Sequence, residues 1–512
     1  MTRKLPIFYN ALMLTGVNLL LRLVSTSFQV FLSGRFGAAG IGLLQLVLSV
    51  ASMTQTCGMA GIRTATMYLT AEELGKGRPQ NVTWVLSACF GYSLCFGGAV
   101  GALVYGLAPQ IACSWIGDLR TVGAIRLFAA FLPVSCFVGV MVGYFTAANR
   151  IATLAAVEVA EQLCSMTVTA LVLLYWAGND GGLACRGVVL GSCVGSLLTL
   201  VCLIVLRLRE GASAGAKISV GRRLRETALP LAVADDLKVG INTVENLMVP
   251  KRLALYTDSA LAQFGMVSGM VFPVLMFPAS ILYALADLLI PEMARCSAAG
   301  SLTRIRYLTR RSLRVALLYG VGCGGVLFVL SDVLCMSLYQ SHLAGEYLAA
   351  YALLVPMLYC DAIIDAINKG LGLQKICVRI NIFTAALDVL GLYLLLPKWG
   401  MRGYFLSFFL THLINAGLSL GLLVKRTGVR IRPYILFLPI AAMLGACSLA
   451  ATLSNPAVKV AAFLLLSDSS LVLCGITGRE DLRWLLGLTG IQKNPIFCKI
   501  VFDKCDKQLY NT

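Results

Sequence analysis

Charged and polar side chains recur at helical spacing within long apolar stretches of this sequence. Residues at i, i+4, i+7 and i+11 share one face of a helix, so each such series forms a polar stripe. Four stripes are present: Asn18, Arg22, Ser25 and Gln29; Glu158, Glu161, Ser165 and Thr169; Asp235, Lys238, Asn242 and Glu245, with Asp236 and Asn246 beside them; Asp361, Asp365 and Asn368. Side chains of these types suit the binding of charged and hydroxyl-rich ligands or of cations.

Covalent chemistry is not indicated by the same residues. We find no nucleophile–His–acid set and no glycine-rich phosphate loop with a lysine, so we do not expect an enzyme or a cofactor. The chain has 18 cysteines but no CxxC pair, and only two histidines, His342 and His412. A metal site is therefore not expected, and most cysteines are interpreted as small side chains compatible with a membrane.

The composition indicates what surrounds these stripes. Hydrophobic residues make up 58% of the 512 residues and charged residues 13%, against about 45–50% and about 25% in soluble domains. Lipid must cover part of this surface, so we predict an all-α integral membrane protein. The net charge of +18 comes in short basic bursts between apolar runs, which is typical of cytoplasmic loops rather than of nucleic-acid binding.

The apolar runs predict about fourteen membrane spans, since one span needs about 20 mostly apolar residues. The expected spans are 7–33, 41–69, 83–107, 122–148, 152–177, 183–206, 227–250, 259–288, 312–330, 347–370, 376–396, 402–424, 433–453 and 457–477. Most lysines and arginines fall on one side when the spans alternate, which predicts that both termini are cytoplasmic. Pro273 and Pro278 permit kinks in the eighth span.

The spacing of the spans predicts the domain organisation. We expect an N-terminal six-helix lobe at 1–207, a cytoplasmic linker at 208–222, and a second six-helix lobe at 223–425. Two further helices at 426–478 and a basic cytoplasmic tail at 479–512 complete the chain. Two parallel six-helix lobes are a known transporter plan with the binding site between the lobes.

The cost of membrane charges indicates what the stripes do. An ionisable residue in a span costs about 2.5–3.5 kcal/mol, so the stripes must face water, substrate or one another. We expect the stripes of the first and seventh spans to meet across a wet gap between the lobes. Arg22, with Arg63 as a second candidate, would bind phosphate because a guanidinium forms paired charge-assisted hydrogen bonds.

Two interpretations of the remaining stripe residues stay open. Asn18, Gln29, Asn242 and Asn368 would bind a saccharide, with Lys238 and Glu245 in the same cavity, whereas Glu158, Glu161, Asp235, Asp236, Asp361 and Asp365 would bind a coupling proton or sodium ion. The acidic groups could instead only pair with cations such as Lys238 or Arg126 and hold the helices together.

Several segments resemble one family in order and spacing. They are SGRFGAAGIGLLQ (33–45), GYFTAANR (143–150), EVAEQ (158–162), ENLMVPKRL (245–253), FGMVSGMVFPVLMFPASILYALADLLIPEMA (264–294) and INKGLGLQK (367–375). They resemble the stage V sporulation protein B-like polysaccharide flippases, related to the lipid II flippases, of the multidrug/oligosaccharidyl-lipid/polysaccharide superfamily.

This resemblance implies a V-shaped transporter in a bacterial cytoplasmic membrane that alternates access to a central cavity. It also implies a polyprenyl-pyrophosphate-linked saccharide as cargo, such as a peptidoglycan or polysaccharide precursor. Arg22 matches a first-span arginine of the lipid II flippases, but Phe28 stands where those proteins have a second arginine. The alternatives are a cation-coupled exporter of small organic molecules, a membrane enzyme, and a scaffold in envelope or spore-coat assembly.

Overall fold

The computed structural model describes residues 5–177, 181–209, 220–429, 433–453 and 455–473, and all regular elements within these ranges are helices. In chain order they are α1 (Leu5–Met59), α2 (Ile62–Gly75), η1 (Pro79–Asn81), α3 (Val82–Gln110), η2 (Ile111–Ile116), η3 (Leu119–Thr121), α4 (Val122–Ala147), α5 (Ile151–Val172), η4 (Leu173–Ala177), α6 (Gly181–Leu208), α7 (Gly221–Leu253), α8 (Ala260–Gly265), η5 (Met266–Val271), α9 (Phe272–Met276), α10 (Ala279–Ala298), α11 (Leu302–Tyr339), α12 (His342–Ala352), α13 (Val355–Gly370), α14 (Gln374–Thr427), α15 (Pro433–Ala451) and α16 (Pro456–Leu473).

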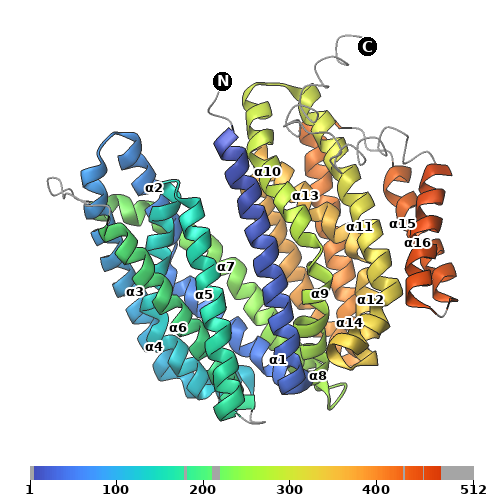
Figure 1. Cartoon of the computed structure of the whole chain (residues 1–512), viewed down its shortest axis with the longest axis horizontal. Helices are drawn as coiled ribbons and strands as arrows, with labels where there is room; N and C mark the ends of the chain where they lie inside the picture. Colours follow the sequence, from blue (N-terminus) through green and yellow to red (C-terminus); the bar gives the residue numbers. More distant parts are fainter. Residues whose placement is uncertain (1–4, 178–180, 210–219, 430–432, 454, 474–512) are drawn as a thin grey trace.

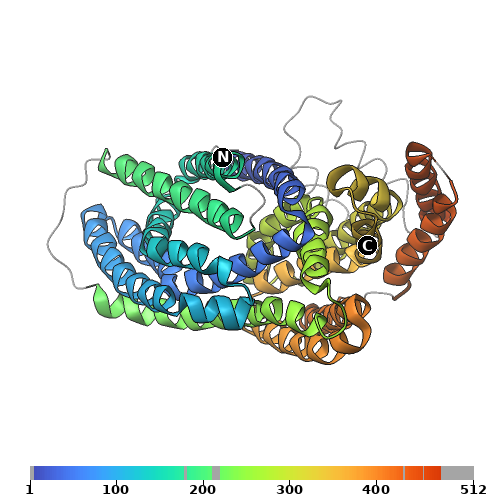
Figure 2. The ribbon, with the colours of Figure 1, turned by 90° about the horizontal axis from the view of Figure 1, so that it is seen from below.

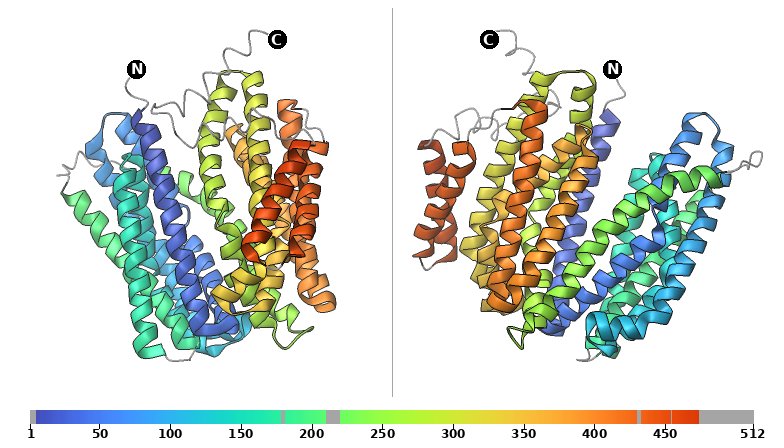
Figure 3. Two further views of the ribbon diagram at one scale, coloured as in Figure 1. Left: turned by 45° about the vertical axis from the view of Figure 1, so that its right-hand side comes forward. Right: turned by 180° about the vertical axis from the view of Figure 1, so that it is seen from behind.

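The helices form two lobes that meet at one end of the molecule and separate toward the other (Figures 1 and 3). We call α2–α6 with the second half of α1 the N-lobe, and α8–α14 the C-lobe. The lobes separate at the end where α2 ends and α11 begins, which we call the basic end because Lys76, Arg78 and the arginines from Arg304 to Arg311 lie there. The other end is the junction end. α15 and α16 lie against α11 at the far edge of the C-lobe (Figure 2).

Side-chain packing supports the V shape. One hydrophobic core runs through the C-lobe and continues into the N-lobe near the junction end, through residues such as Ile41, Ile111 and Ile125. A separate core fills the other half of the N-lobe and includes Leu69 of α2 and Leu224 at the start of α7. The two lobes therefore share a packed interior at the junction end.

Two long helices are hairpins rather than single rods. Within α14, the Ser407 hydroxyl donates to the Asp388 carboxylate at 2.6 Å, and Thr384 and Asn415 are hydrogen-bonded at 3.3 Å. Residues 19 and 31 positions apart can touch only if the chain folds back, and it does so at Gly400, whose φ of 55° favours glycine. α1 also turns at a glycine with positive φ, Gly37.

The predicted class, an all-α multi-pass membrane protein in two lobes, is confirmed, whereas the count of fourteen spans is not established. Among the described residues, seven helices are long and apolar enough to cross a membrane, or up to nine if each bent pair is one span. The pair Ala260–Met276 and Ala279–Ala298 bends by 62°, in the span where Pro273 and Pro278 permit a kink. Within the expected span 41–69 the helix breaks at Ala60 and Gly61, both with positive φ.

Two helices cross the expected boundary between the lobes. The first half of α1 contacts the C-lobe, where the Gln29 amide donates to the Gly269 carbonyl at 3.0 Å. The first half of α7 instead lies on the N-lobe, where Arg223 pairs with Glu72 and Glu73 of α2. The basic tail expected at 479–512 and residues 210–219 of the expected linker lie outside the described residues.

Candidate functional site

The structure distributes the four predicted polar stripes over four places rather than one chamber. The second half of α1, not the first, packs along α7: Asn246 donates to the Ser49 hydroxyl at 3.0 Å, and Thr243 to the Ser49 carbonyl at 3.3 Å. Within the described side chains, no contact joins Arg22 to the α7 stripe. The sequence could not distinguish the halves of α1, because both carry polar residues at helical spacing.

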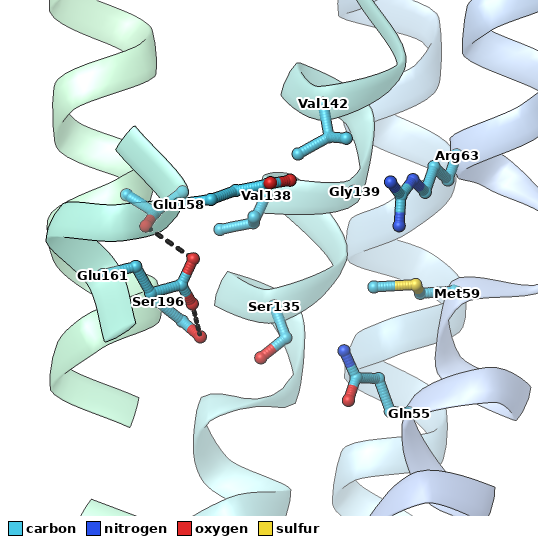
Figure 4. Close-up of a pocket in the computed structure, with 11 residues that line it drawn as sticks. Gln55, Met59, Arg63, Ser135, Val138, Gly139, Val142, Glu158, Glu161 and Ser196 are labelled. Atoms are coloured by element: carbon cyan, nitrogen blue, oxygen red, sulfur yellow. Dashed lines mark hydrogen bonds between the residues drawn. The ribbon is translucent and has the colours of Figure 1, made fainter. Parts of the chain in front are cut away.

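A polar pocket lies inside the N-lobe (Figure 4). It has a volume of about 170 Å³ and is lined by Gln55, Met59, Arg63, Ser135, Val138, Gly139, Val142, Glu158, Glu161, Ser196 and Thr199. Both oxygens of Glu161 accept hydrogen bonds, from Thr199 at 2.8 Å and Ser196 at 3.3 Å. Three predicted residues, Arg63, Glu158 and Glu161, therefore come together here.

The first half of α1 carries Arg22 and Gln29 beside the C-lobe. Arg22 is half-buried and interacts electrostatically with Tyr359 of α13, whose hydroxyl donates to the Leu275 carbonyl at 3.2 Å. Ser25 accepts a hydrogen bond from Gln162 of α5 at 3.4 Å, so this helix half also touches the N-lobe. The side chain of Asn18 lies outside the described part of the chain.

The α7 stripe changes surroundings along its length. Asp235, Lys238 and Asn242 are exposed, and Asp236 lies against Cys57 near the break that separates α1 from α2. Asp236 also lines an open, mostly apolar groove of about 380 Å³ between α1, α7 and α14. Farther along α7, Glu245 approaches Asp388 of the C-lobe.

The fourth stripe lies within the C-lobe. Asp361 accepts a hydrogen bond from Asn415 at 2.9 Å, and Asp365 pairs with Lys369 at 2.6 Å. Asn368 is fully buried and donates to the Ser419 carbonyl at 3.0 Å, so it packs α13 against α14.

One buried carboxylate of the C-lobe was missed in the sequence. Asp388 is 6% exposed and accepts hydrogen bonds from Ser407 at 2.6 Å and Thr411 at 3.2 Å. The signal was present, because Asp388 is the single charge in the apolar run 380–397. Across the described residues, no group of three or more His, Cys, Asp or Glu has the geometry to hold a metal ion.

The chain is similar in sequence to a known protein. No protein-family profile matches the chain. The chain is 23% identical over 411 residues to stage V sporulation protein B of Bacillus subtilis (strain 168), which covers 77% of this chain and 78% of that protein. The resemblance predicted from the sequence is thus confirmed.

Solved structures show the same fold at low sequence identity. The lipid II flippase MurJ in an inward closed conformation matches with a TM-score of 0.65 and 13% identity, over 90% of this chain and 99% of that chain. An inward-facing multidrug resistance MATE transporter of the MOP superfamily matches with a TM-score of 0.64 and 11% identity, over 80% and 98%. These proteins are a flippase and a transporter, not enzymes, and the chain has the MOP-superfamily transporter fold.

Proposed function

We propose that this protein is a flippase that moves a lipid-linked saccharide, a peptidoglycan or polysaccharide precursor, across the bacterial cytoplasmic membrane by alternating access. The observation that carries the proposal is the arrangement of the lobes, which share a packed core at the junction end and separate at the basic end. The similarity to stage V sporulation protein B and to the fold of MurJ supports it.

The orientation follows from the charges. Lysines and arginines concentrate on the cytoplasmic side of membrane proteins, so we assign the basic end to the cytoplasm. The lobes then separate on the cytoplasmic side, the state that would admit a lipid-linked precursor made inside the cell. The polyprenyl chain of such a cargo would stay in the bilayer while its polar head entered between the lobes.

Arg22 is the proposed contact for the pyrophosphate of the cargo. It lies on the half of α1 that runs between the lobes, and its half-buried guanidinium offers paired donors to an anion. Gln29, Lys238 and Asn242 are proposed to contact the saccharide.

Transport of fluorescent lipid II in vesicles tests this proposal. Arg22→Ala should abolish flipping while the purified protein keeps its thermal stability. Arg126→Ala is the matched control, because Arg126 lies on α4 over the Tyr105 ring at 5.3 Å, outside the region between the lobes. Normal flipping by Arg22→Ala would refute the assigned role, and no flipping of any polyprenyl-linked sugar by the unmodified protein would refute the function.

The C-lobe carboxylates are proposed to bind the coupling cation, a proton or sodium ion. Hydroxyl groups surround Asp388, and one oxygen of Asp361 is buried without a hydrogen bond, while Glu245 approaches Asp388 from α7. Oxygen-rich sites of this kind suit hard cations, and a buried carboxylate can also be neutralised by a proton.

A cation-coupled exporter of small organic molecules is the second candidate function. The N-lobe pocket favours it, because a polar space of about 170 Å³ fits a small molecule better than a disaccharide head group. Drug accumulation in cells with and without the protein separates the two functions.

A further inference from the structure

The N-lobe pocket contains two opposite charges that do not pair with each other. Arg63 extends from α2 and Glu158 from α5, and their charged ends point toward one another across the pocket (Figure 4). They are close enough to interact electrostatically, yet among the described residues neither group forms a hydrogen bond or an ion pair. The pocket that both side chains line offers room for another group.

Other charges of the pocket are already satisfied. Both oxygens of Glu161 accept hydrogen bonds from the hydroxyls of α6, which holds this carboxylate against the wall of the pocket. Gln55 and Ser135 offer neutral polar groups on the remaining sides. The unused binding capacity consists of one guanidinium fork and one carboxylate that face each other.

We propose that this pocket binds a small zwitterionic group, with its anion on Arg63 and its ammonium on Glu158. An isolated anion would meet Glu158, and an isolated cation would meet Arg63, so either would be repelled by one wall. A group that carries both charges satisfies both walls at once. The guanidinium gives a carboxylate or phosphate two parallel hydrogen bonds, and the carboxylate accepts from an ammonium.

The size of the pocket limits the ligand. A volume of about 170 Å³ admits a small polar group rather than a large molecule. An amino-acid end or a phosphoethanolamine group matches this volume. The first would come from a peptide-bearing molecule and the second from a membrane phospholipid, and both present the same pair of charges.

Binding to the purified full-length protein in a neutral detergent tests the site. Calorimetric titration would compare β-alanine and glycerophosphoethanolamine, a phosphodiester with one negative charge, with their single-charge halves, propionate, dimethyl phosphate and ethylamine. We expect at least one zwitterion to bind about tenfold or more tightly than either of its halves, a gain of about 1.4 kcal/mol. The zwitterion that binds better identifies the source of the group.

Variants separate this site from a structural ion pair. Arg63→Gln and Glu158→Gln should each reduce the affinity for the zwitterion to that of the half-ligands. The exchanged variant R63E/E158R should recover zwitterion binding, because it keeps both charges on opposite walls. Glu226→Gln is the control, since Glu226 lies at the start of α7 and pairs with Arg222 at 2.9 Å.

Two results would overturn the proposal. The first is that neither zwitterion binds the unmodified protein more tightly than its halves do. The second is that Arg63→Gln and Glu158→Gln bind the zwitterion with the affinity of the unmodified protein. Melting curves without ligand show whether each variant is folded. If a single variant does not fold, zwitterion binding by the exchanged variant R63E/E158R tests the proposal instead. The assay involves no transport, so its outcome is independent of the flippase proposal.

Discussion

The junction between the lobes offers a sharp test of alternating access at Gly265. A Cβ atom added there would meet the Ala38 carbonyl and would lie 2.5 Å from the Gly42 nitrogen and 2.9 Å from its Cα. Real Cβ atoms essentially never approach closer than 3.0 Å, and here the obstacle is backbone, which cannot rotate away. Gly265→Ala therefore has to push α8 away from α1.

The size of the expected shift between closed and open junctions follows from the cost of this steric overlap. Insertion of a methyl group into a packed contact typically costs about 1–3 kcal/mol. This cost applies only while the junction is closed, because α1 and α8 lose this contact when the lobes separate there. A differential cost of about 1–3 kcal/mol shifts the ratio of closed to open junctions by about 5- to 150-fold.

Spin-label distances across the junction end measure this shift. The labels should be attached to non-canonical amino acids that replace Leu119 of the N-lobe and Leu255, next to the C-lobe. This labelling avoids the 18 native cysteines. Both positions are exposed. We expect Gly265→Ala to increase the population with long distances.

A matched glycine provides the control. Alanine raises helix propensity by about 1 kcal/mol wherever it replaces a helical glycine, so the control must share this gain without the clash. Gly98 of α3 is suitable, because a Cβ there has nothing within 4 Å. Unchanged distances in Gly265→Ala, or equal shifts in Gly98→Ala, would refute the role of this contact.

Two further predictions concern the C-lobe. Phe463→Ala should destabilise the docking of α16 on α11 by about 3 kcal/mol, because the fully buried ring fills the space above Gly325. Thermal unfolding should show a lower Tm for this variant than for Leu465→Ala, whose side chain is 72% exposed. Equal Tm values would contradict this packing. Asp388→Asn should remove the dependence of flipping on a sodium or proton gradient. Asp332→Asn should retain this dependence, because Asp332 forms an exposed pair with His342. An unchanged ion dependence in Asp388→Asn would exclude Asp388 as the coupling site.

Much of the fold could be predicted because a membrane helix is recognisable from a single apolar stretch of sequence. The apolar runs predicted the class, and Pro273 and Pro278 permitted a kink in the span that bends by 62°. At the break between α1 and α2, Gly61 tolerates its positive φ of 72°, whereas Ala60, an ordinary helix former, adopts a positive φ of 41° that its residue type does not indicate. Asp388 was missed although Thr384 lies one helical turn before it on the same face, because Asp388 is the single charge in its apolar run and no second charge accompanies it.

The candidate site was predicted less completely than the fold. Arg63 and two residues of the α5 stripe, Glu158 and Glu161, line the N-lobe pocket, and their role stays a prediction. Ser196 and Thr199, which hold Glu161, were missed because single hydroxyl residues are common in membrane helices. Asn368 was assigned to a cavity by its spacing, yet it is fully buried.

The sequence by itself determined that this chain is a helical membrane protein, which faces of its helices are polar, and which proteins it resembles. Only the tertiary structure decided how those faces meet. A polar stripe fixes a direction within its own helix, but the rotation and partner of that helix depend on packing with residues far along the chain. Gln29 and Gly269, 240 positions apart, are joined by one hydrogen bond. In lipid, apolar surface on a neighbouring helix and on an acyl chain are nearly equivalent, so hydrophobic pattern alone cannot specify such partners.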